Sequence, residues 1–284
     1  MKLFHYKNIN IKFYVSFQIL LLAAFLLVGC AANQAQVEVK VESEVAFAEL
    51  KKEYYPSGKL KSEVNVLDGK KEGIFKLYYE SGKLKVERNY KNGKLEGLAK
   101  GYYESGELKG EGNYKNGKRE GLVKLYYPSG KLKQDLNYKN DKLEGLEKEY
   151  YPNGELNFEK NYINGKQEGI AKAYYKSGKL KQDVNYKNGE VEGFGKMYYK
   201  SGQLWMEKNF KNGKAEGIEK HYYETGQLGA VSSYKNDKKE GIEKFYYKSG
   251  GYQYVDTHKD GNKINRKAYT ARGKLGLDQN DYPQ

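Results

Sequence analysis

The chain has 284 residues, a formal net charge of +14 at pH 7 and 31% charged residues. Its 30 Tyr side chains can bury a large apolar area, which argues against an intrinsically disordered chain. Its single cysteine has no partner within the chain, which excludes a framework of intrachain disulfides.

The beginning of the sequence has the pattern of a bacterial lipoprotein signal. Three Lys residues within the first twelve positions precede an apolar run that ends in "ILLLAAFLLVGC". The final LVGC resembles a lipobox, at which a signal peptidase cleaves before a cysteine that carries lipid. An uncleaved membrane anchor is the alternative, but the apolar run is short and is broken by Ser16 and Gln18. We therefore predict that residues 1–29 are a lipoprotein signal peptide and that Cys30 is the lipidation site.

Lipidation of Cys30 would anchor the mature chain to a membrane. Residues 30–48 contain no Gly or Pro and would form the tether between the lipid and the rest of the chain. Several acyl chains on one cysteine hold a protein far more firmly than a single chain, whose membrane binding is marginal. We expect a lipid-anchored protein of the cell membrane or outer membrane that faces the periplasm or the exterior.

A strict repeat of 24 residues follows the tether. Glu-Gly, Ser-Gly and Asn-Gly or Asp-Gly pairs recur at this interval between pairs of tyrosines. A period this regular is typical of a quasi-one-dimensional repeat fold, in which each unit packs on its neighbours. The Tyr-Tyr pairs begin at positions 54, 78, 102, 126, 150, 174, 198, 222 and 246.

The spacing within one period predicts a β-hairpin. Asn-Gly and Asp-Gly supply the positive φ angles of tight hairpin turns, and Ser-Gly suits the second turn. The runs between these turns are rich in aromatic residues and too short for helices. We predict an all-β fold, an elongated antiparallel array of about nine β-hairpin repeats that occupies residues 49–275. A degenerate terminal cap would follow these repeats within the same range, and residues 276–284 would form a tail.

Two rows of apolar residues stay constant between the repeats, and we predict that they form the core. Successive side chains of a strand alternate between its faces, so the residue after Glu-Gly shares a face with the Lys two positions on. The first row follows Glu-Gly and comprises Ile74, Leu98, Leu122, Leu146, Ile170, Phe194, Ile218 and Ile242. The second row marks the returning strand and comprises Leu60, Leu84, Leu108, Leu132, Leu156, Leu180, Leu204 and Leu228.

The positions between the constant ones change from repeat to repeat, and we expect them to form the exposed face that binds a partner. Position 75 and its equivalents are Phe, Ala, Val, Glu, Ala, Gly, Glu and Glu in chain order. Position 77 and its equivalents vary as freely. The candidate interaction surface consists of Phe75, Leu77, Val123, Leu125, Met197, Trp205, Met206, His221 and Phe245.

The polar residues predict neither a catalytic nor a metal site. Lys and acidic residues recur in equivalent settings, whereas catalysis needs one site whose groups differ from their surroundings. Cross-strand Lys–Glu pairing that keeps a long sheet soluble is the simpler interpretation. His221 and His258 stand apart from Cys and from clustered carboxylates, so we expect no metal and no cofactor. We predict that the protein is not an enzyme.

The net positive charge and the Tyr rows would also suit nucleic acid, because aromatic rings can stack on bases. The Lys residues, however, are interleaved with acidic residues rather than gathered in one block. We therefore expect no nucleic acid partner. A polyanionic glycan or an anionic lipid surface is a better candidate among charged ligands.

The unit "Y-x-N-G-x-x-E-G-x-x-K-x-Y-Y-x-S-G-K-L" resembles the bacterial variant of the MORN repeat, which is often found in proteins labelled antitoxin-like. Tyr90, Asn92, Gly93 and Gly97 correspond to the Tyr, the Asn-Gly and the second Gly of that repeat. Glu96 stands where many MORN repeats have His, which places this chain among the variants. The resemblance implies an elongated antiparallel sheet of hairpins that serves as a scaffold or an interaction surface.

Three hypotheses for function follow. In the first, the protein is a non-enzymatic, membrane-anchored repeat lipoprotein that binds an unknown protein partner at the cell envelope. In the second, it is a glycan, cell-wall or anionic-surface binding module that uses shallow Tyr-lined grooves. In the third, which rests on family labels alone, it is an antitoxin-like partner that neutralises a toxin.

Overall fold

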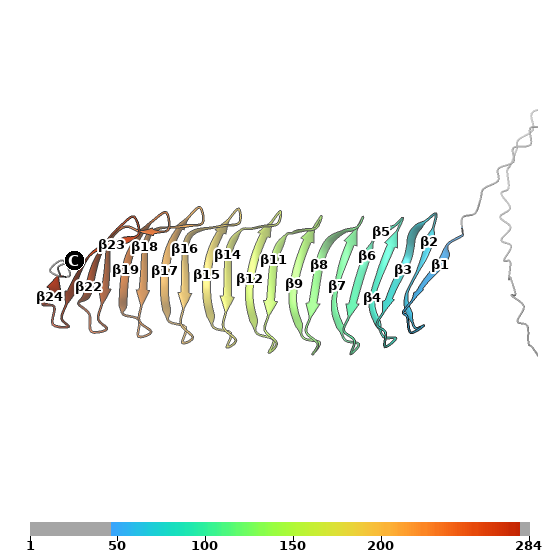
Figure 1. Cartoon of the computed structure of the whole chain (residues 1–284), viewed down its shortest axis with the longest axis horizontal. Coiled ribbons are helices and arrows are strands. Elements are labelled where there is room, and N and C mark those ends of the chain that lie inside the picture. The colour runs from blue at the N-terminus through green and yellow to red at the C-terminus, as the bar shows by residue number, and fades with distance from the viewer. Residues whose placement is uncertain (1–46, 279–284) are drawn as a thin grey trace, which may run out of the picture. The chain divides into compact units, whose positions relative to one another are not determined.

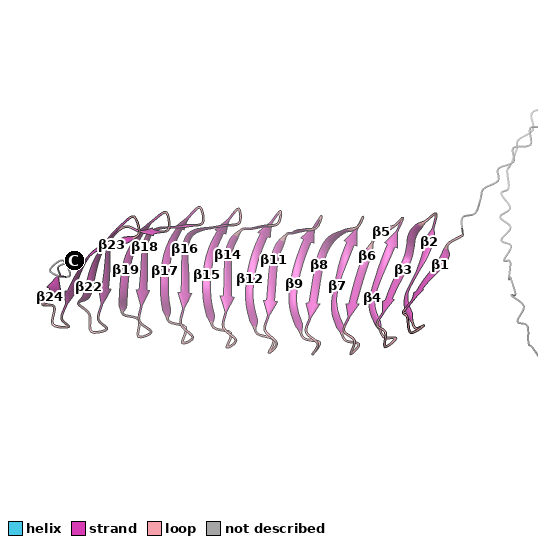
Figure 2. Cartoon of the chain, viewed as in Figure 1, coloured by secondary structure: helices cyan, strands magenta, loops and turns pink. Residues whose placement is uncertain are grey.

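The computed structural model describes residues 47–278, which form one open antiparallel sheet of 24 strands (Figure 1). The strands are joined by turns, and no helix occurs within this range (Figure 2). The described residues accordingly contain no helix that could cross a membrane. The prediction of an all-β array of hairpin repeats is confirmed. The predicted signal peptide and Cys30 lie outside the described residues.

Strands that follow one another along the chain pair antiparallel, so the hairpins stand in a row from β1 to β24 (Figure 1), and the two halves of an interrupted strand pair with the same neighbour. Four strands of two residues are the first halves of longer strands that are interrupted at the Glu of a Glu-Gly pair. The strands are β1 (Glu49–Tyr54), β2 (Leu60–Leu67), β3 (Lys70–Tyr78), β4 (Leu84–Lys91), β5 (Lys94–Leu95), β6 (Gly97–Tyr102), β7 (Leu108–Lys115), β8 (Lys118–Tyr126), β9 (Leu132–Lys139), β10 (Lys142–Leu143), β11 (Gly145–Tyr150), β12 (Leu156–Ile163), β13 (Lys166–Gln167), β14 (Gly169–Tyr174), β15 (Leu180–Lys187), β16 (Glu190–Tyr198), β17 (Leu204–Lys211), β18 (Lys214–Tyr222), β19 (Leu228–Lys235), β20 (Lys238–Lys239), β21 (Gly241–Tyr246), β22 (Tyr252–Lys259), β23 (Asn262–Tyr269) and β24 (Leu275–Asp278).

The Asn-Gly pairs form the two-residue turns at one rim of the sheet. Asn92 and Gly93 have φ angles of 51° and 78°, and the flanking Lys91 and Lys94 face each other across the strands. Positive φ at both central residues is the geometry of a type I′ turn, whose twist matches that of the strands it joins. The Asn-Gly pairs therefore form the tight hairpin turns that the sequence predicts.

A ladder of tyrosine hydroxyls joins each repeat to the next at the other rim. The second Tyr of each pair donates its hydroxyl to the backbone carbonyl of the first Tyr in the following repeat, over 2.6–3.0 Å. The last of these bonds reaches the degenerate terminal repeat. The donors in the described residues are Tyr55, Tyr79, Tyr103, Tyr127, Tyr151, Tyr175, Tyr199, Tyr223 and Tyr247.

A second ladder joins the repeats at the rim of the Asn-Gly turns. The carboxylate of each Glu-Gly pair accepts a hydrogen bond from the backbone N–H that opens the next turn, over 2.7–2.9 Å. Glu72, for example, accepts from the N–H of Asn92. The constant Tyr and Glu residues of the repeat are therefore explained by contacts between repeats, in addition to any role in the turns.

Four of the constant tyrosines that begin the pairs also donate hydrogen bonds to acidic residues. Tyr78 donates to Glu63 over 2.7 Å, and equivalent bonds occur from Tyr126, Tyr174 and Tyr222. Burial, with the hydrogen bond to Glu63, raises the pKa of Tyr78 to about 12. The predicted cross-strand Lys–acid placement is confirmed as well, since Lys76 lies opposite Glu87. The recurring acidic groups are thus part of the scaffold.

The prediction that the row beginning with Ile74 forms the core is wrong. Ile74 is 54% exposed and Phe194 is 65% exposed, and the other members of the row are exposed as well. The described residues form a single sheet, so no second layer covers this face. The row that begins with Leu60 is half-buried. We call the face that carries Ile74, Lys76 and their equivalents the constant face.

The other face, which carries Phe75, Leu77 and their equivalents, is packed more closely, and we call it the variable face. Its most buried apolar side chains are Val64, Leu136, Val184, Ala215 and Ala230, at 2–7% exposure. Side chains on neighbouring strands bury one another here, as where Val184 and Phe210 both reach within 3.3 Å of a Cβ placed on Gly195. The variable positions are therefore not the most exposed positions of the sheet.

The tyrosine ladder predicts a measurable loss of stability from one hydroxyl. Tyr127→Phe removes the bond to the carbonyl of Tyr150 and should lower the free energy of unfolding by about 1 kcal/mol, measured by urea denaturation. Tyr54→Phe is the control, because Tyr54 is 58% exposed and precedes the first rung. Equal losses from both variants would contradict a stabilising role for the ladder.

Candidate interaction surface

The nine residues predicted to bind a partner lie along the sheet from β3 to β21. Trp205 is 40% exposed and the other eight are half-buried. Their clustering follows from the strand register: Leu77 faces Val86 and Met197 faces Met206 across neighbouring strands. Five of the nine line two hollows, one around Leu125 and one around Trp205. The other four, Phe75, Leu77, Met197 and Met206, line neither of these hollows.

The first place is an apolar hollow of about 260 Å³ over β4, β6, β7 and β8. Val123 and Leu125 form one wall, with Val86 among the facing residues. Gly110 and Gly112 form its floor, and a Cβ on either would come within 2.7–2.8 Å of the Leu125 or Val123 side chain. The glycines thus allow two large apolar side chains to lie directly on the backbone of β7.

The second place is a hollow of about 370 Å³ over β17, β18, β19 and β21. Three of the predicted residues, Trp205, His221 and Phe245, line it together with Tyr199 and Tyr223. The ring of Trp205 lies 6.2 Å from that of Tyr199 and 6.0 Å from that of His221. Gly229, Ala230, Glu219, Lys239 and Glu243 also contribute to the lining.

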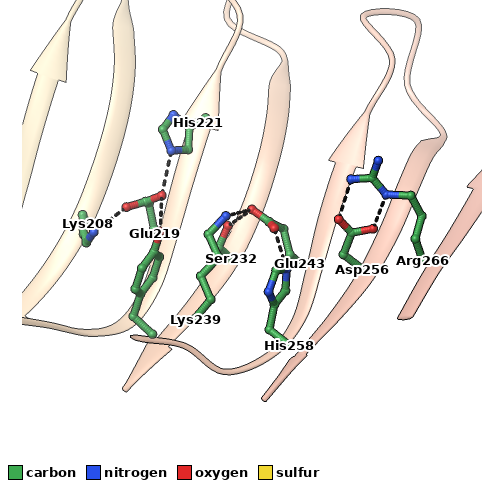
Figure 3. Close-up of polar contacts among 10 residues, drawn as sticks. Lys208, Glu219, His221, Ser232, Lys239, Glu243, Asp256, His258 and Arg266 are labelled. Atoms are coloured by element: carbon green, nitrogen blue, oxygen red, sulfur yellow. Dashed lines mark hydrogen bonds and ion pairs between the residues drawn. The ribbon is translucent and has the colours of Figure 1, made fainter. Parts of the chain in front are cut away.

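A row of polar and charged residues crosses the strands that form this second hollow, and Figure 3 shows the polar contacts among them. The register places its members opposite one another on successive strands. In order across the sheet they are Lys208, Glu219, Ser232, Glu243, Asp256 and Arg266. The three acidic members are 2–6% exposed, so we call this row the buried polar row. Buried charges are stable only when they are paired and hydrogen-bonded.

Each carboxylate of the buried polar row has a cationic partner. Glu219 accepts from Lys208 at 2.9 Å, from the His221 ring at 2.8 Å and from Tyr234 at 3.4 Å. Arg266 donates two bonds of 2.7 Å to Asp256.

Glu243 lies between these two groups. It accepts from Ser232 at 2.8 Å, from the His258 ring at 2.9 Å and from Lys239. The row is therefore close to neutral as a whole.

The surroundings of Glu219 lower the pKa of its carboxyl group. Burial raises the pKa of this carboxyl, but the hydrogen bonds from His221 and Lys208 outweigh burial and lower it to about 2. Glu219 is consequently ionised at neutral pH inside a closely packed part of the sheet. Its ionised form stabilises the fold fully above the pKa of the unfolded carboxyl, and this stabilisation is lost as the pH falls towards the folded pKa.

His258 has carboxylate neighbours, contrary to expectation. The expectation that it stands apart from clustered carboxylates is wrong, because pairing of β21 with β22 brings Glu243 and Asp256 beside it, with possible ligand atoms within 4.8 Å of one another. Lys239 and Arg266 already neutralise these two carboxylates, so a cation would have to displace them. The arrangement is better explained as an ion-pair network than as a metal centre.

The sequence pattern did not predict several residues of this surface. The acidic side chains at positions 147, 219 and 243 were expected to be exposed, yet they are 5–7% exposed. Tyr199 and Tyr223 were assigned only to the repeated pattern. The register of the hairpins was the available signal, since it places Lys208 opposite Glu219. Cys30 was predicted as the lipidation site and lies outside the described residues.

The comparisons with known proteins identify the repeat. The sequence matches the family described as "MORN repeat variant" in eight segments that together cover more than half of the chain. No curated protein matches. The matched segments are residues 50–68, 71–92, 95–116, 119–140, 143–164, 167–188, 192–212 and 215–236.

Solved structures with local similarity include chains that are much longer than this one. One is described as "Crystal Structure of TcdB2-TccC3-Cdc42", with 15% identity and a TM-score of 0.16. Another is the Tc holotoxin pore of Photorhabdus luminescens, with 14% identity and a TM-score of 0.15. The matches cover 80% and 78% of this chain but only 13% of each of the other chains. TM-scores this low do not establish a shared fold.

The low pKa of Glu219 predicts an acid-dependent loss of stability. The unfolded carboxyl has a pKa near 4.5 and the folded one a pKa of about 2, so the stabilisation is complete above pH 4.5 and is lost as the pH falls towards 2. Glu219→Gln should therefore lower the free energy of unfolding by about 3 kcal/mol at pH 7 and have little effect near pH 2, measured by urea denaturation. Glu224→Gln, at an exposed turn of the same repeat, is the control. A difference between Glu219→Gln and the unmodified protein that does not change with pH would contradict the assignment.

Proposed function

Because the chain belongs to the MORN repeat variant family, we propose that it is a non-enzymatic, membrane-anchored repeat protein that binds a protein partner at the cell envelope. The observation that carries this proposal is the division between the two sets of positions in each repeat. The constant Tyr and Glu residues are used in ladders between repeats, whereas the variable positions do not take part in those ladders. Selection between partners would then reside in the variable face.

The variable face changes its chemistry along the sheet, as expected of a surface that distinguishes one partner from another. Around Val123 and Leu125 it is apolar and hollowed over glycines. Around Glu219 and Glu243 it is charged, closely packed and rich in aromatic rings. Protein interfaces typically combine an apolar centre with a polar rim, and a few well-packed anchors supply most of the binding energy. A partner that spans several repeats would meet both kinds of surface.

Attachment to a membrane is proposed from the lipobox before Cys30. An anionic surface is the second candidate ligand, and the observation that favours it is the net charge of +14 together with the Lys row of the constant face that begins at Lys76. Neutralisation of a toxin would be a narrower form of protein binding.

Partner binding is tested by capture on the mature chain, residues 31–284, from an extract of the cells that produce it. A specific protein that stays bound in 0.5 M salt, where the Debye length is about 4 Å, is the expected result. Leu125→Ala should weaken its binding about tenfold, and Leu122→Ala should not. These two leucines lie on the same strand, β8, but on opposite faces. Ligands that are all polyanions and are all released at this salt concentration would overturn the proposal.

Membrane attachment is tested separately by Cys30→Ala. The variant cannot carry the lipid, so we expect it in the soluble fraction after cell lysis, whereas the unmodified protein sediments with membranes. Ser57→Ala, at an exposed turn of the first repeat, is the control and should remain with the membranes. Membrane association of Cys30→Ala equal to that of the control would show that Cys30 is not the anchor.

A further inference from the structure

The hollow beside Trp205 arises from two departures from the repeat. In three earlier repeats, the residue that follows the constant Leu of the returning strand is a lysine, and this lysine covers the ring of the second Tyr. The ammonium groups of Lys85, Lys109 and Lys133 lie 5.1, 5.7 and 5.8 Å from the ring centres of Tyr79, Tyr103 and Tyr127. The register between the two strands of each hairpin shifts at this position, which leaves the lysine without a cross-strand partner. The lysine thus closes the surface over the tyrosine ladder.

Trp205 and Gly229 occupy this position in two successive repeats. Trp205 brings a second large ring next to Tyr199, and Gly229 leaves the neighbouring Tyr223 without the lysine of its own repeat. Ala230 follows Gly229 and lies between His221 and Phe245 in the cross-strand register. Two small residues therefore form a floor between walls of aromatic rings. The resulting hollow of about 370 Å³ lies within the usual size range of small-ligand sites, roughly 300–1,000 Å³.

The charges around the hollow favour a neutral ligand. Glu219 and Glu243 both line it, but Lys208 neutralises the first and Lys239 the second. An ammonium group, that of Lys248, already lies 5.5 Å from the ring of Tyr223. A cationic ligand would meet carboxylates that are already paired, and an anionic ligand would meet those same carboxylates at close range.

The carboxylates that line the hollow can accept further hydrogen bonds from the hydroxyl groups of a ligand. An ionised carboxylate has about four lone-pair sites, and Glu219 and Glu243 each use three of them within the protein. Each can thus accept one further hydrogen bond. The aromatic walls offer apolar ring faces with a negative quadrupole, which attract the weakly positive C–H groups of a saturated ring.

We propose that this hollow binds a neutral sugar ring of a glycan. The ring would stack its C–H face against Trp205 and donate hydroxyl hydrogen bonds to Glu219 and Glu243. The site does not depend on the proposed protein partner, and it would give the C-terminal part of the sheet a ligand of its own. Sugar binding of this kind is non-covalent and leaves the glycan intact.

Trp205 is the only Trp of the chain, so its fluorescence reports directly on the hollow. The full-length protein in detergent is titrated with two neutral tetrasaccharides, chitotetraose and cellotetraose, and with choline chloride as a cationic probe. We expect a saturable fluorescence change with at least one tetrasaccharide, with a Kd of roughly 0.1–1 mM. We expect no saturable change with choline chloride.

Two variants fill the hollow while keeping the reporter. Gly229→Lys restores the residue found in most other repeats, and a Cβ at Gly229 meets its nearest atom at an ordinary 3.4 Å. Ala230→Met inserts the side chain found at the equivalent position 206. Both should weaken sugar binding at least tenfold. Lys109→Gly, which makes the reverse change in a distant repeat, is the control and should bind normally.

Three results would overturn the proposal. The first is the absence of a saturable response to either tetrasaccharide up to about 10 mM, and the second is a response to choline chloride in their place. The third is unchanged sugar affinity in both filled variants. Failure to capture a protein partner has no bearing on any of these readouts, so the two proposals fail independently.

Discussion

The fold depends on hydrogen bonds between neighbouring repeats, and the hydroxyl of the second Tyr in each pair supplies one of these bonds in every described repeat. A single open sheet has no second layer that could bury one of its faces, so its repeats must be held together along the sheet itself. Backbone pairing supplies part of this, and the tyrosine ladder adds a side-chain bond at one rim while the glutamate ladder adds one at the other. Because each bond joins only adjacent repeats, stability accumulates by nearest-neighbour terms, as in other repeat proteins. This explains why Tyr-Tyr and Glu-Gly keep their spacing when the residues between them change.

Because the two ladders lie at the rims of the sheet, the residues in the middle of each hairpin can differ from repeat to repeat. On the variable face, Gly110 and Gly112 allow Val123 and Leu125 to lie against the backbone, whereas the equivalent region near the C-terminus holds paired charges. Both solutions fit the same backbone because a cross-strand neighbour compensates for each side chain. A glycine on one strand leaves room for a large apolar side chain on the next strand, and a cation on one strand pairs with a buried carboxylate on the next. The repeat therefore tolerates unlike surfaces along one sheet, which is the physical basis for proposing that recognition occurs there.

The sequence alone predicts the hairpins correctly, but it does not predict which face of the sheet is closely packed. Positive φ at Asn-Gly turns and the 24-residue period determine the strands and their order, and these agree with the structure. Strand alternation shows that Ile74 and Lys76 share a face, but it does not show which face is covered. The constancy of the Ile74 row predicts a core, yet that row is exposed. The burial of Glu219 could not be read from its identity, because it depends on Lys208, His221 and Tyr234 from three different positions of the register.

The hollow beside Trp205 is a better candidate for ligand binding than the rest of the surface. A repeated surface offers equivalent shallow sites, and a lysine over a tyrosine ring closes several of them. A site with its own chemistry requires the pattern to be broken, and the break at Trp205 and Gly229 does so in adjacent repeats. Because the ladders hold the backbone in place, these substitutions change the surface without changing the register. The tyrosine that stabilises the fold through its hydroxyl then presents its ring to a ligand, so one side chain serves both the scaffold and the proposed site.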